Sequence, residues 1–290
     1  MNQQNRSSRW RAVGIKQVMA LLMGAMLVGC QAPQHALRDL AAQHDHRLEI
    51  ISSHPFPLAM GTPLRPITGT RIRLYIEGDG YAWATRSRPS LDPTPRTMLV
   101  AHLAFDDPTP SIYLARPCQY VMAAGCRPEL WTSQRFSSDV VSSLEQALDQ
   151  IKLRYGNRDF ELIGYSGGGA LALLLAARRD DIAHVQTLAG NLTPRRWVEL
   201  QQLSPLSGSL DPGDHREQLR HIPQRHLAGG KDKVVPAALM QDYIESLDEP
   251  VCVESAVIPD ATHAEGWRHA WVAFRERSLD CGVPMRSRQP

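Results

Sequence analysis

The residues Gly164-Tyr165-Ser166-Gly167-Gly168 are the strongest indication of the fold that this chain adopts. It follows an apolar run at 160–163, typical of a strand, and precedes a helix-forming run of alanine and leucine at 170–177. Glycines suit a sharp turn here, because the serine takes strained backbone angles and larger neighbours would collide with the adjoining strand and helix. The pattern predicts a strand, a tight turn and a helix, with the Ser166 hydroxyl exposed at the strand tip.

Two other interpretations of this stretch must be weighed. One is a glycine-rich turn in which the serine has no chemical role. The other is a phosphate-binding loop, which would need a lysine followed by serine or threonine after the last glycine. Ala170 and Leu171 stand there instead, so the sequence favours Ser166 as a nucleophile.

A serine in this arrangement needs an acid and then a base further along the chain. Asp232 is the candidate acid, because it follows a short strand-like run at 226–230 and stands where that strand ends. A helix is expected over 236–247, with Pro236 at its start. The alternative role for Asp232 is therefore to cap this helix.

His263 is the candidate base. It lies in the polar loop after a strand-like run at 252–258, and among 11 histidines it alone occupies the loop after the strand that follows Asp232. A neutral imidazole there takes the proton of Ser166 and returns it to the leaving group, while Asp232 holds the other ring nitrogen. Asp260 is a rival acid, but it lies too close in sequence to His263 to come from a different strand tip.

An oxyanion hole completes such a site, with two backbone N–H groups directed at the substrate oxygen. Gly167, directly after the serine, is expected to supply one of them. A strand-like run at 71–77 ends in a glycine-rich loop, from which the N–H of Tyr81 is favoured for the second, followed by that of Gly80. The alternative is a Gly-Asp-Gly hairpin turn at 78–80.

Through the stretch at 164–168, Asp232, His263 and the loop at 78–81, the chain resembles the α/β-hydrolase superfamily. The resemblance covers most of the chain after the N-terminal segment, and it implies the α/β-hydrolase fold, an α/β class with a mostly parallel central sheet and helices on both faces. It also implies a covalent acyl-enzyme on the serine, which water then hydrolyses. One departure is Glu77, which stands where many lipases and esterases have the histidine of a His-Gly-Gly-Gly loop.

A single domain is expected over residues 47–290. Hydrophobic residues make up 43% of the chain, which is ample for one core, and strand-like and helix-like runs alternate as in a parallel sheet covered by helices. Two segments are candidate walls of a substrate pocket: the loop at 118–126 and the insertion at 192–215.

The start of the chain resembles a bacterial lipoprotein signal peptide over residues 1–29. Basic residues precede an apolar run at 18–28, which is short for a membrane span and ends just before Cys30. The resemblance implies that Cys30 becomes the acylated first residue and that 30–46 is a short tether. The protein would then be held by lipid in the bacterial cell envelope, facing the periplasm or in the outer membrane. The alternative is an uncleaved N-terminal anchor.

Removal of residues 1–29 changes the charge balance. The chain has 32 Lys and Arg against 30 Asp and Glu, and the removed segment holds four bases and no acid, which leaves 28 bases and a net charge near −2. No stripe of basic and aromatic residues remains to suggest a nucleic-acid surface. Nucleic acid is therefore not an expected partner.

Beside Cys30 the chain has four cysteines, namely Cys118, Cys126, Cys252 and Cys281. An even number in an exported protein favours disulfides. Pairing of Cys118 with Cys126 closes a short loop at low entropic cost and leaves Cys252 for Cys281, although two other connectivities stay open. No Cys-x-x-Cys or His-Glu-x-x-His spacing is present, so neither a metal nor a cofactor is expected.

Together these observations predict a serine hydrolase that cleaves an ester through an acyl-enzyme on Ser166, as a carboxylesterase or thioesterase. Its partners are then a small ester or acyl substrate and the membrane that holds the acylated Cys30. The same three side chains also cleave amides, so a peptidase or amidase is one alternative. A hydrolase-fold lipoprotein that binds a ligand or an envelope partner without catalysis is the other.

Overall fold

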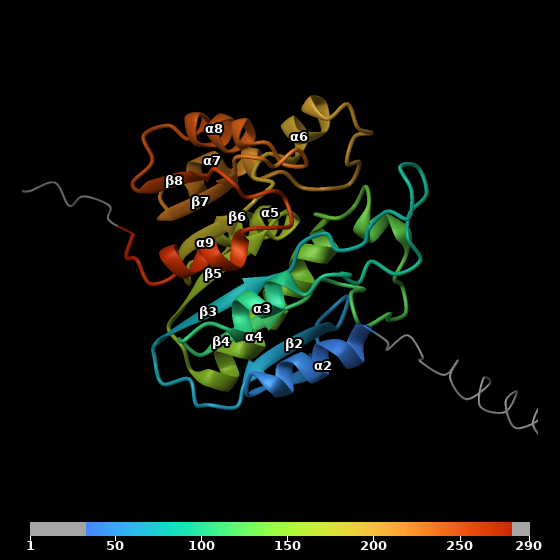
Figure 1. Cartoon of the computed structure of the whole chain (residues 1–290), viewed down its shortest axis with the longest axis vertical. Helices are drawn as coiled ribbons and strands as arrows, with labels where there is room; N and C mark the ends of the chain where they lie inside the picture. Colours follow the sequence, from blue (N-terminus) through green and yellow to red (C-terminus); the bar gives the residue numbers. More distant parts are fainter. Residues whose placement is uncertain (1–32, 280–290) are drawn as a thin grey trace, which may run out of the picture.

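The computed structural model describes residues 33–279, which form a sheet of eight strands in the order β1-β2-β4-β3-β5-β6-β7-β8 (Figure 1). The strands are β1 (His46–Ile51), β2 (Leu58–Pro63), β3 (Arg71–Ile76), β4 (Ser111–Leu114), β5 (Asp159–Tyr165), β6 (Ile182–Leu188), β7 (Gln224–Gly229) and β8 (Val253–Ile258). β4, β3 and β5 to β8 pair in parallel, whereas β1 and β2 extend the sheet as antiparallel strands. The mostly parallel sheet that the sequence predicts is confirmed, and the antiparallel edge was not foreseen.

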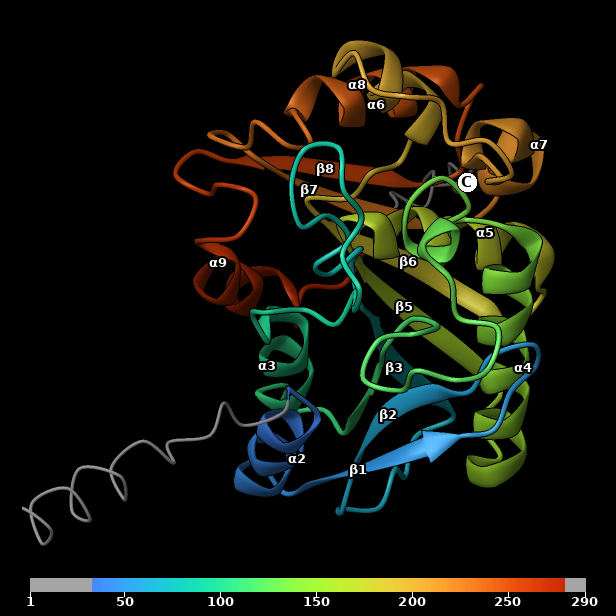
Figure 2. The ribbon, with the colours of Figure 1, turned by 90° about the vertical axis from the view of Figure 1, so that its right-hand side faces the viewer.

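Helices cover both faces of this sheet (Figure 2). They are α2 (Pro33–Gln43), α3 (Leu99–Phe105), α4 (Ser138–Tyr155), α5 (Gly167–Arg178), α6 (Pro194–Leu200), α7 (Arg216–Leu219), α8 (Ala237–Ser246) and α9 (Trp267–Phe274), with short 3-10 turns at Pro128–Trp131 and Pro212–His215. α2, α3 and α9 share one cluster of buried side chains, and α4, α5, α7 and α8 share the other. The sheet therefore separates two hydrophobic cores.

α5 is the most deeply buried helix of the described residues. It lies against β5 and β6 and packs on α4, and the side chains of Leu171, Leu173, Leu174 and Leu175 have no exposed surface. A helix that is apolar on all sides needs such a place between other elements. The start of α5, where it meets the end of β5, is consequently held in a fixed position.

The N-terminal part differs from the prediction. A tether is expected over 30–46, but α2 occupies most of that segment and packs on β1 and α3. Leu37, Leu40 and Ala41 are buried, and their spacing places them on one side of the helix. This apolar stripe anchors α2 to the body of the protein, so the packed structure begins before residue 47.

The pairing of Cys118 with Cys126 is confirmed, with their Cα atoms 5.7 Å apart. Cys252 is buried, but Cys281 lies outside the described residues, so the second pair stays a prediction. Residues 1–29 and Cys30 also lie outside the described part of the chain. Within residues 33–279, no helix has both the length and the apolar character needed to cross a bilayer.

Candidate active site

Ser166 stands at the junction of β5 and α5, with φ 53° and ψ −121°. A Cβ atom at Gly164 would lie 2.4 Å from the carbonyl oxygen of Gly168, and one at Gly168 would lie 2.4 Å from the carbonyl oxygen of Ile76. Both distances are shorter than a van der Waals contact, so a side chain at either position would collide with the backbone. β3, β5 and α5 can therefore approach this closely only because both residues are glycine. The steric reason that the sequence suggested for the two glycines is thus present in the fold.

A chain of hydrogen bonds joins three side chains from three strand ends. His263 Nε2 lies 3.0 Å from Ser166 Oγ, and His263 Nδ1 lies 2.8 Å from Asp232 Oδ2. Because an ionised carboxylate only accepts, Nδ1 carries the ring proton and Nε2 is left to accept from the serine hydroxyl. The structure therefore brings together the three residues that the sequence singled out, in the tautomer that a general base requires.

Asp232 is held on both of its oxygens. Its side chain is fully buried, and Oδ1 accepts hydrogen bonds from the backbone N–H groups of Val234 at 2.8 Å and Val235 at 2.9 Å. Oδ2 is then left for His263. Asp232 does not cap α8, because the N–H groups that it binds precede that helix, whose N-cap Pro236 has no side-chain hydrogen bond.

Two aromatic side chains that sequence reasoning missed hold the loop of His263. The Tyr165 hydroxyl donates to the His263 carbonyl oxygen at 2.7 Å, and Trp267 Nε1 donates to the same oxygen at 2.9 Å. The Tyr165 and His263 rings also lie against each other, with centroids 5.4 Å apart. Tyr165 precedes the serine and Trp267 begins α9, so no local pattern relates them. Together they fix the backbone from which the imidazole projects.

The loop after β3 lies beside the serine, but the backbone N–H of Tyr81 is already hydrogen-bonded. The Tyr81 N–H donates to the carbonyl oxygen of Pro93 at 2.9 Å, so that N–H is not free for an oxyanion, and the assignment of Tyr81 is corrected. A Cβ atom at Gly78 would lie 3.3 Å from Ser166 Cβ. The next residue along, Asp79, touches Gly167, because its Oδ1 lies 2.2 Å from the position of a Cβ at that glycine.

Three of the backbone N–H groups near Ser166 are considered as candidate donors to a substrate oxygen. Those of Gly167, Asp79 and Gly80 have no hydrogen-bond acceptor among residues 33–279. The Gly167 N–H is at the start of α5, where the first turn of a helix leaves its N–H groups unpaired. A sequence pattern alone does not show which N–H of a glycine-rich loop is already bonded.

Asp79 is held by two buried arginines. Its Oδ2 accepts from Arg135 Nη1 at 2.7 Å, and its Oδ1 accepts from Arg116 Nη1. Burial opposes ionisation of this carboxyl, but the two guanidinium groups outweigh it and hold the pKa of Asp79 below its usual range. Arg116 lies two residues before Cys118, so the confirmed disulfide constrains the segment that supplies it.

Glu77, in the position of the missing histidine, is buried and bonded within the fold. Oε1 accepts from the Gly78 N–H at 2.9 Å, and Oε2 accepts from the Tyr113 hydroxyl at 2.9 Å. Burial raises the pKa of Glu77 to about 7, against the opposing effect of these two hydrogen bonds. Glu77 therefore has a structural role here, because its carboxyl group binds the backbone of the loop at Gly78 and the side chain of Tyr113.

The insertion at 192–215, a predicted pocket wall, lies next to the acid. Trp197 Nε1 in α6 donates to the carbonyl oxygen of Val234 at 2.7 Å, two residues after Asp232. The guanidinium of Arg135 lies 5.7 Å from the centre of the Trp197 ring. α6 thus joins the loop of Asp232 to the arginines around Asp79.

Comparison with known proteins finds likeness in structure alone. No protein-family model matches the chain, and no curated protein matches its sequence. The Pyrococcus furiosus esterase Pf2001 superposes with a TM-score of 0.59 at 13% identity, covering 88% of this chain and 96% of the esterase. An alpha-beta serine hydrolase homologue from Coxiella burnetii has a TM-score of 0.54 at 16% identity, with coverages of 79% and 94%.

Est1E from Butyrivibrio proteoclasticus is similar to the same degree, with a TM-score of 0.54 at 12% identity, over 78% of this chain and 94% of its own. These likenesses, together with the strand order and the helices on both faces, show that the protein has the α/β-hydrolase fold. At such identities they define the fold, and the chemistry must be argued from this chain's own residues.

Proposed function

We propose that the protein is a serine hydrolase that cleaves a carboxylic ester or thioester through an acyl-enzyme on Ser166. The observation that carries the proposal is the hydrogen-bond chain from Asp232 through His263 to Ser166. Its distances lie in the range that a general base needs toward the group it deprotonates. The choice of an ester over an amide is part of the proposal, because the same three side chains cleave both.

The geometry supports the following steps. Ser166 Oγ attacks the carbonyl carbon while its proton passes to His263 Nε2, and Asp232 stabilises the imidazolium through Nδ1. The negative charge on the carbonyl oxygen is taken up by the N–H groups of Gly167 and Asp79. Collapse of this intermediate returns the proton from His263 to the leaving oxygen or sulfur. Water, deprotonated by the same nitrogen, then releases the acid and restores Ser166.

The assignment of Asp79 as the second donor follows from its neighbours. Gly78 packs on the serine side chain and the Asp79 side chain touches Gly167, so the N–H between these two contacts is next to the carbonyl that the serine would attack. The Asp79 carboxylate would repel an oxyanion, but Arg116 and Arg135 neutralise it. Gly80 is the second choice, since it lies one residue further along the loop from the contact between Gly78 and the serine side chain.

Labelling with a fluorophosphonate tests the proposal, since it reacts covalently only with an activated serine. The full-length protein, extracted in detergent with its disulfides intact, is compared with Ser166→Ala, His263→Ala and the exposed control Ser204→Ala. We expect labelling of the wild type and of Ser204→Ala, none of Ser166→Ala, and a fall of about 10⁴-fold or more in His263→Ala. A folded wild-type protein that stays unlabelled would leave the non-catalytic binding protein as the better interpretation.

Turnover of matched p-nitrophenyl esters, thioesters and anilides then separates the substrate classes. Ester or thioester hydrolysis that exceeds anilide hydrolysis supports the proposal as stated. Faster cleavage of the anilides would instead indicate the peptidase or amidase.

We also propose that residues 1–29 are removed and that Cys30 is acylated, so that the hydrolase is held at a membrane of the bacterial envelope. The support is the pattern of basic residues, short apolar run and cysteine. Metabolic labelling with an alkyne fatty acid is expected to mark the wild type and not Cys30→Ser, with Cys126→Ser as the control. Equal labelling of Cys30→Ser would overturn the acylation site.

A further inference from the structure

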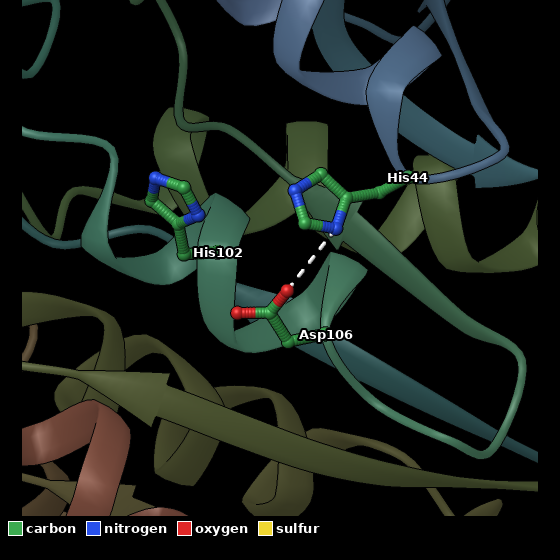
Figure 3. A group of neighbouring side chains, drawn as sticks. All are labelled: His44, His102 and Asp106. Atoms are coloured by element: carbon green, nitrogen blue, oxygen red, sulfur yellow. Dashed lines mark ion pairs between the residues drawn. The ribbon is translucent and has the colours of Figure 1, made fainter.

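His44, His102 and Asp106 form a cluster on the side of the sheet that α2, α3 and α9 cover (Figure 3). His44 lies in the turn between α2 and β1, His102 lies in α3, and Asp106 directly follows α3. One ligand atom from each residue lies within 4.8 Å of the other two. Within residues 33–279 this is the only group of three or more His, Cys, Asp or Glu side chains with that property.

The Asp106 carboxylate is already oriented by a neighbour. Its Oδ2 accepts a hydrogen bond from Arg268 Nη2 of α9 at 2.8 Å, which turns Oδ1 toward His44 Nδ1 at 3.1 Å. The side chains of His44 and Asp106 are 28% and 32% exposed, so an ion and a water molecule can reach them from solvent. A carboxylate held on its second oxygen in this way is typical of metal sites.

His102 contributes a nitrogen that lacks a partner. Its Nδ1 is shielded from solvent and has no hydrogen bond within the described part of the chain. In Figure 3 the ring directs a nitrogen toward His44 and Asp106, and the two imidazole rings lie nearly perpendicular with centroids 6.0 Å apart. Buried polar atoms without a partner are uncommon and call for an explanation. An ion pair between His44 and Asp106 alone does not supply one, because it leaves this nitrogen unbonded.

We infer that His44, His102 and Asp106 bind one divalent transition-metal ion, and that zinc is the ion that fits best. Two imidazole nitrogens and one carboxylate oxygen, with water as the fourth ligand, make a common tetrahedral zinc set. Magnesium and calcium prefer oxygen ligands throughout and fit this set poorly. His102 in α3 and Asp106 directly after it are four residues apart, a spacing that places both side chains on the same side and within reach of one ion.

The ion would join the turn after α2 to the end of α3, with Arg268 connecting α9 to the same carboxylate. Such a site stabilises the folded protein, because the ligands are brought together only after folding. It is independent of the proposed hydrolase activity, since none of its residues belongs to the hydrogen-bond chain of Ser166.

Calorimetric titration of the full-length protein with zinc chloride tests the inference, with no histidine tag present. The variants are His44→Gln and His102→Gln, with the exposed His269→Gln of α9 as the matched control and His263→Gln to detect zinc at the serine site. We expect about one zinc ion per chain and a raised melting temperature in the wild type and both controls. Each ligand variant should lose about 100-fold in affinity, and the visible absorption of bound Co²⁺ should indicate a tetrahedral site.

The alternatives give distinct results. Wild-type protein that binds no zinc at millimolar concentration, or binding that both ligand variants retain, would overturn the inference. Loss of binding in His263→Gln alone would place the ion at Ser166. If His102→Gln melts at a much lower temperature without zinc, the partly exposed His44→Gln decides the question by itself.

Discussion

The loop after β5, at 164–168, and the loop after β3, at 77–81, lie next to each other at the serine, but they are held in different ways. The first is shaped by backbone contacts, because glycine lets β5 and α5 meet within a few residues. The second is held by ion pairs from Asp79 to Arg116 and Arg135, which come from later segments of the chain.

The two loops are therefore expected to tolerate substitution to different degrees. Backbone atoms in contact cannot move apart without moving β3 and α5, so a single methyl group at the first loop is expected to be costly. The aspartate and arginine side chains that hold the second loop can adjust by rotation. A change there is therefore expected to shift the backbone N–H groups of the loop before it unfolds the protein. Three substitutions examine this contrast.

Gly168→Ala should have the largest effect, because the new Cβ would lie 2.4 Å from the Ile76 carbonyl oxygen. We expect the free energy of unfolding to fall by about 3 kcal/mol or more, and fluorophosphonate labelling to fall about 100-fold as Ser166 is displaced. Urea unfolding and labelling rates measure both. Gly69→Ala is the matched control, since the closest atom to its Cβ is 3.5 Å away. Equal unfolding curves for the two variants would refute the steric account of the turn.

Asp79→Asn should have an intermediate effect. It leaves two buried guanidinium groups without their carboxylate, and removal of one partner from a buried pair is strongly destabilising. Since Asp79 is 20% exposed, we expect a loss of about 2 kcal/mol, and a labelling rate about tenfold lower because the loop carrying its N–H shifts. The exposed Asp180→Asn serves as control. An unchanged labelling rate in Asp79→Asn would show that the ion pairs of Asp79 do not position the N–H groups of the oxyanion hole.

Glu77→Gln should have the smallest effect, visible as a change in pH dependence. The folded protein holds the pKa of Glu77 at about 7, above its ordinary value of 4.5, so the unfolded chain loses this proton first as pH rises. Glu77 therefore lowers stability progressively between about pH 4.5 and 7. We expect Glu77→Gln to be more stable relative to the wild type at pH 8 than at pH 5, by roughly 1 kcal/mol or more.

Urea unfolding at the two pH values checks this prediction, with the exposed Glu245→Gln as the control. A stability difference that is the same at pH 5 and pH 8 would show that Glu77 titrates normally.

Much of the site was predictable because its parts follow strand ends. Ser166, Asp232 and His263 each come directly after a strand-like run, and parallel strands bring such residues to one edge of a sheet. Tyr81 was assigned wrongly, because the bond from its N–H to Pro93 depends on how a distant loop folds back. The sequence predicts a tether over 30–46, although the buried side chains of α2 recur at helical spacing and indicate a packed helix.

The turn at Ser166, the parallel sheet and the order of the candidate acid and base could be predicted from the sequence, since these depend on local backbone sterics and on the periodicity of apolar residues. The folded structure was needed to show which N–H groups remain unbonded near the serine and which side chains surround Asp79. The folded structure also places His44 beside His102 and Asp106, and no sequence spacing relates His44 to the other two. The physical reason is that hydrogen bonds and metal ligands depend on distances in space, and residues far apart in the chain acquire those distances only when the sheet and its helices pack.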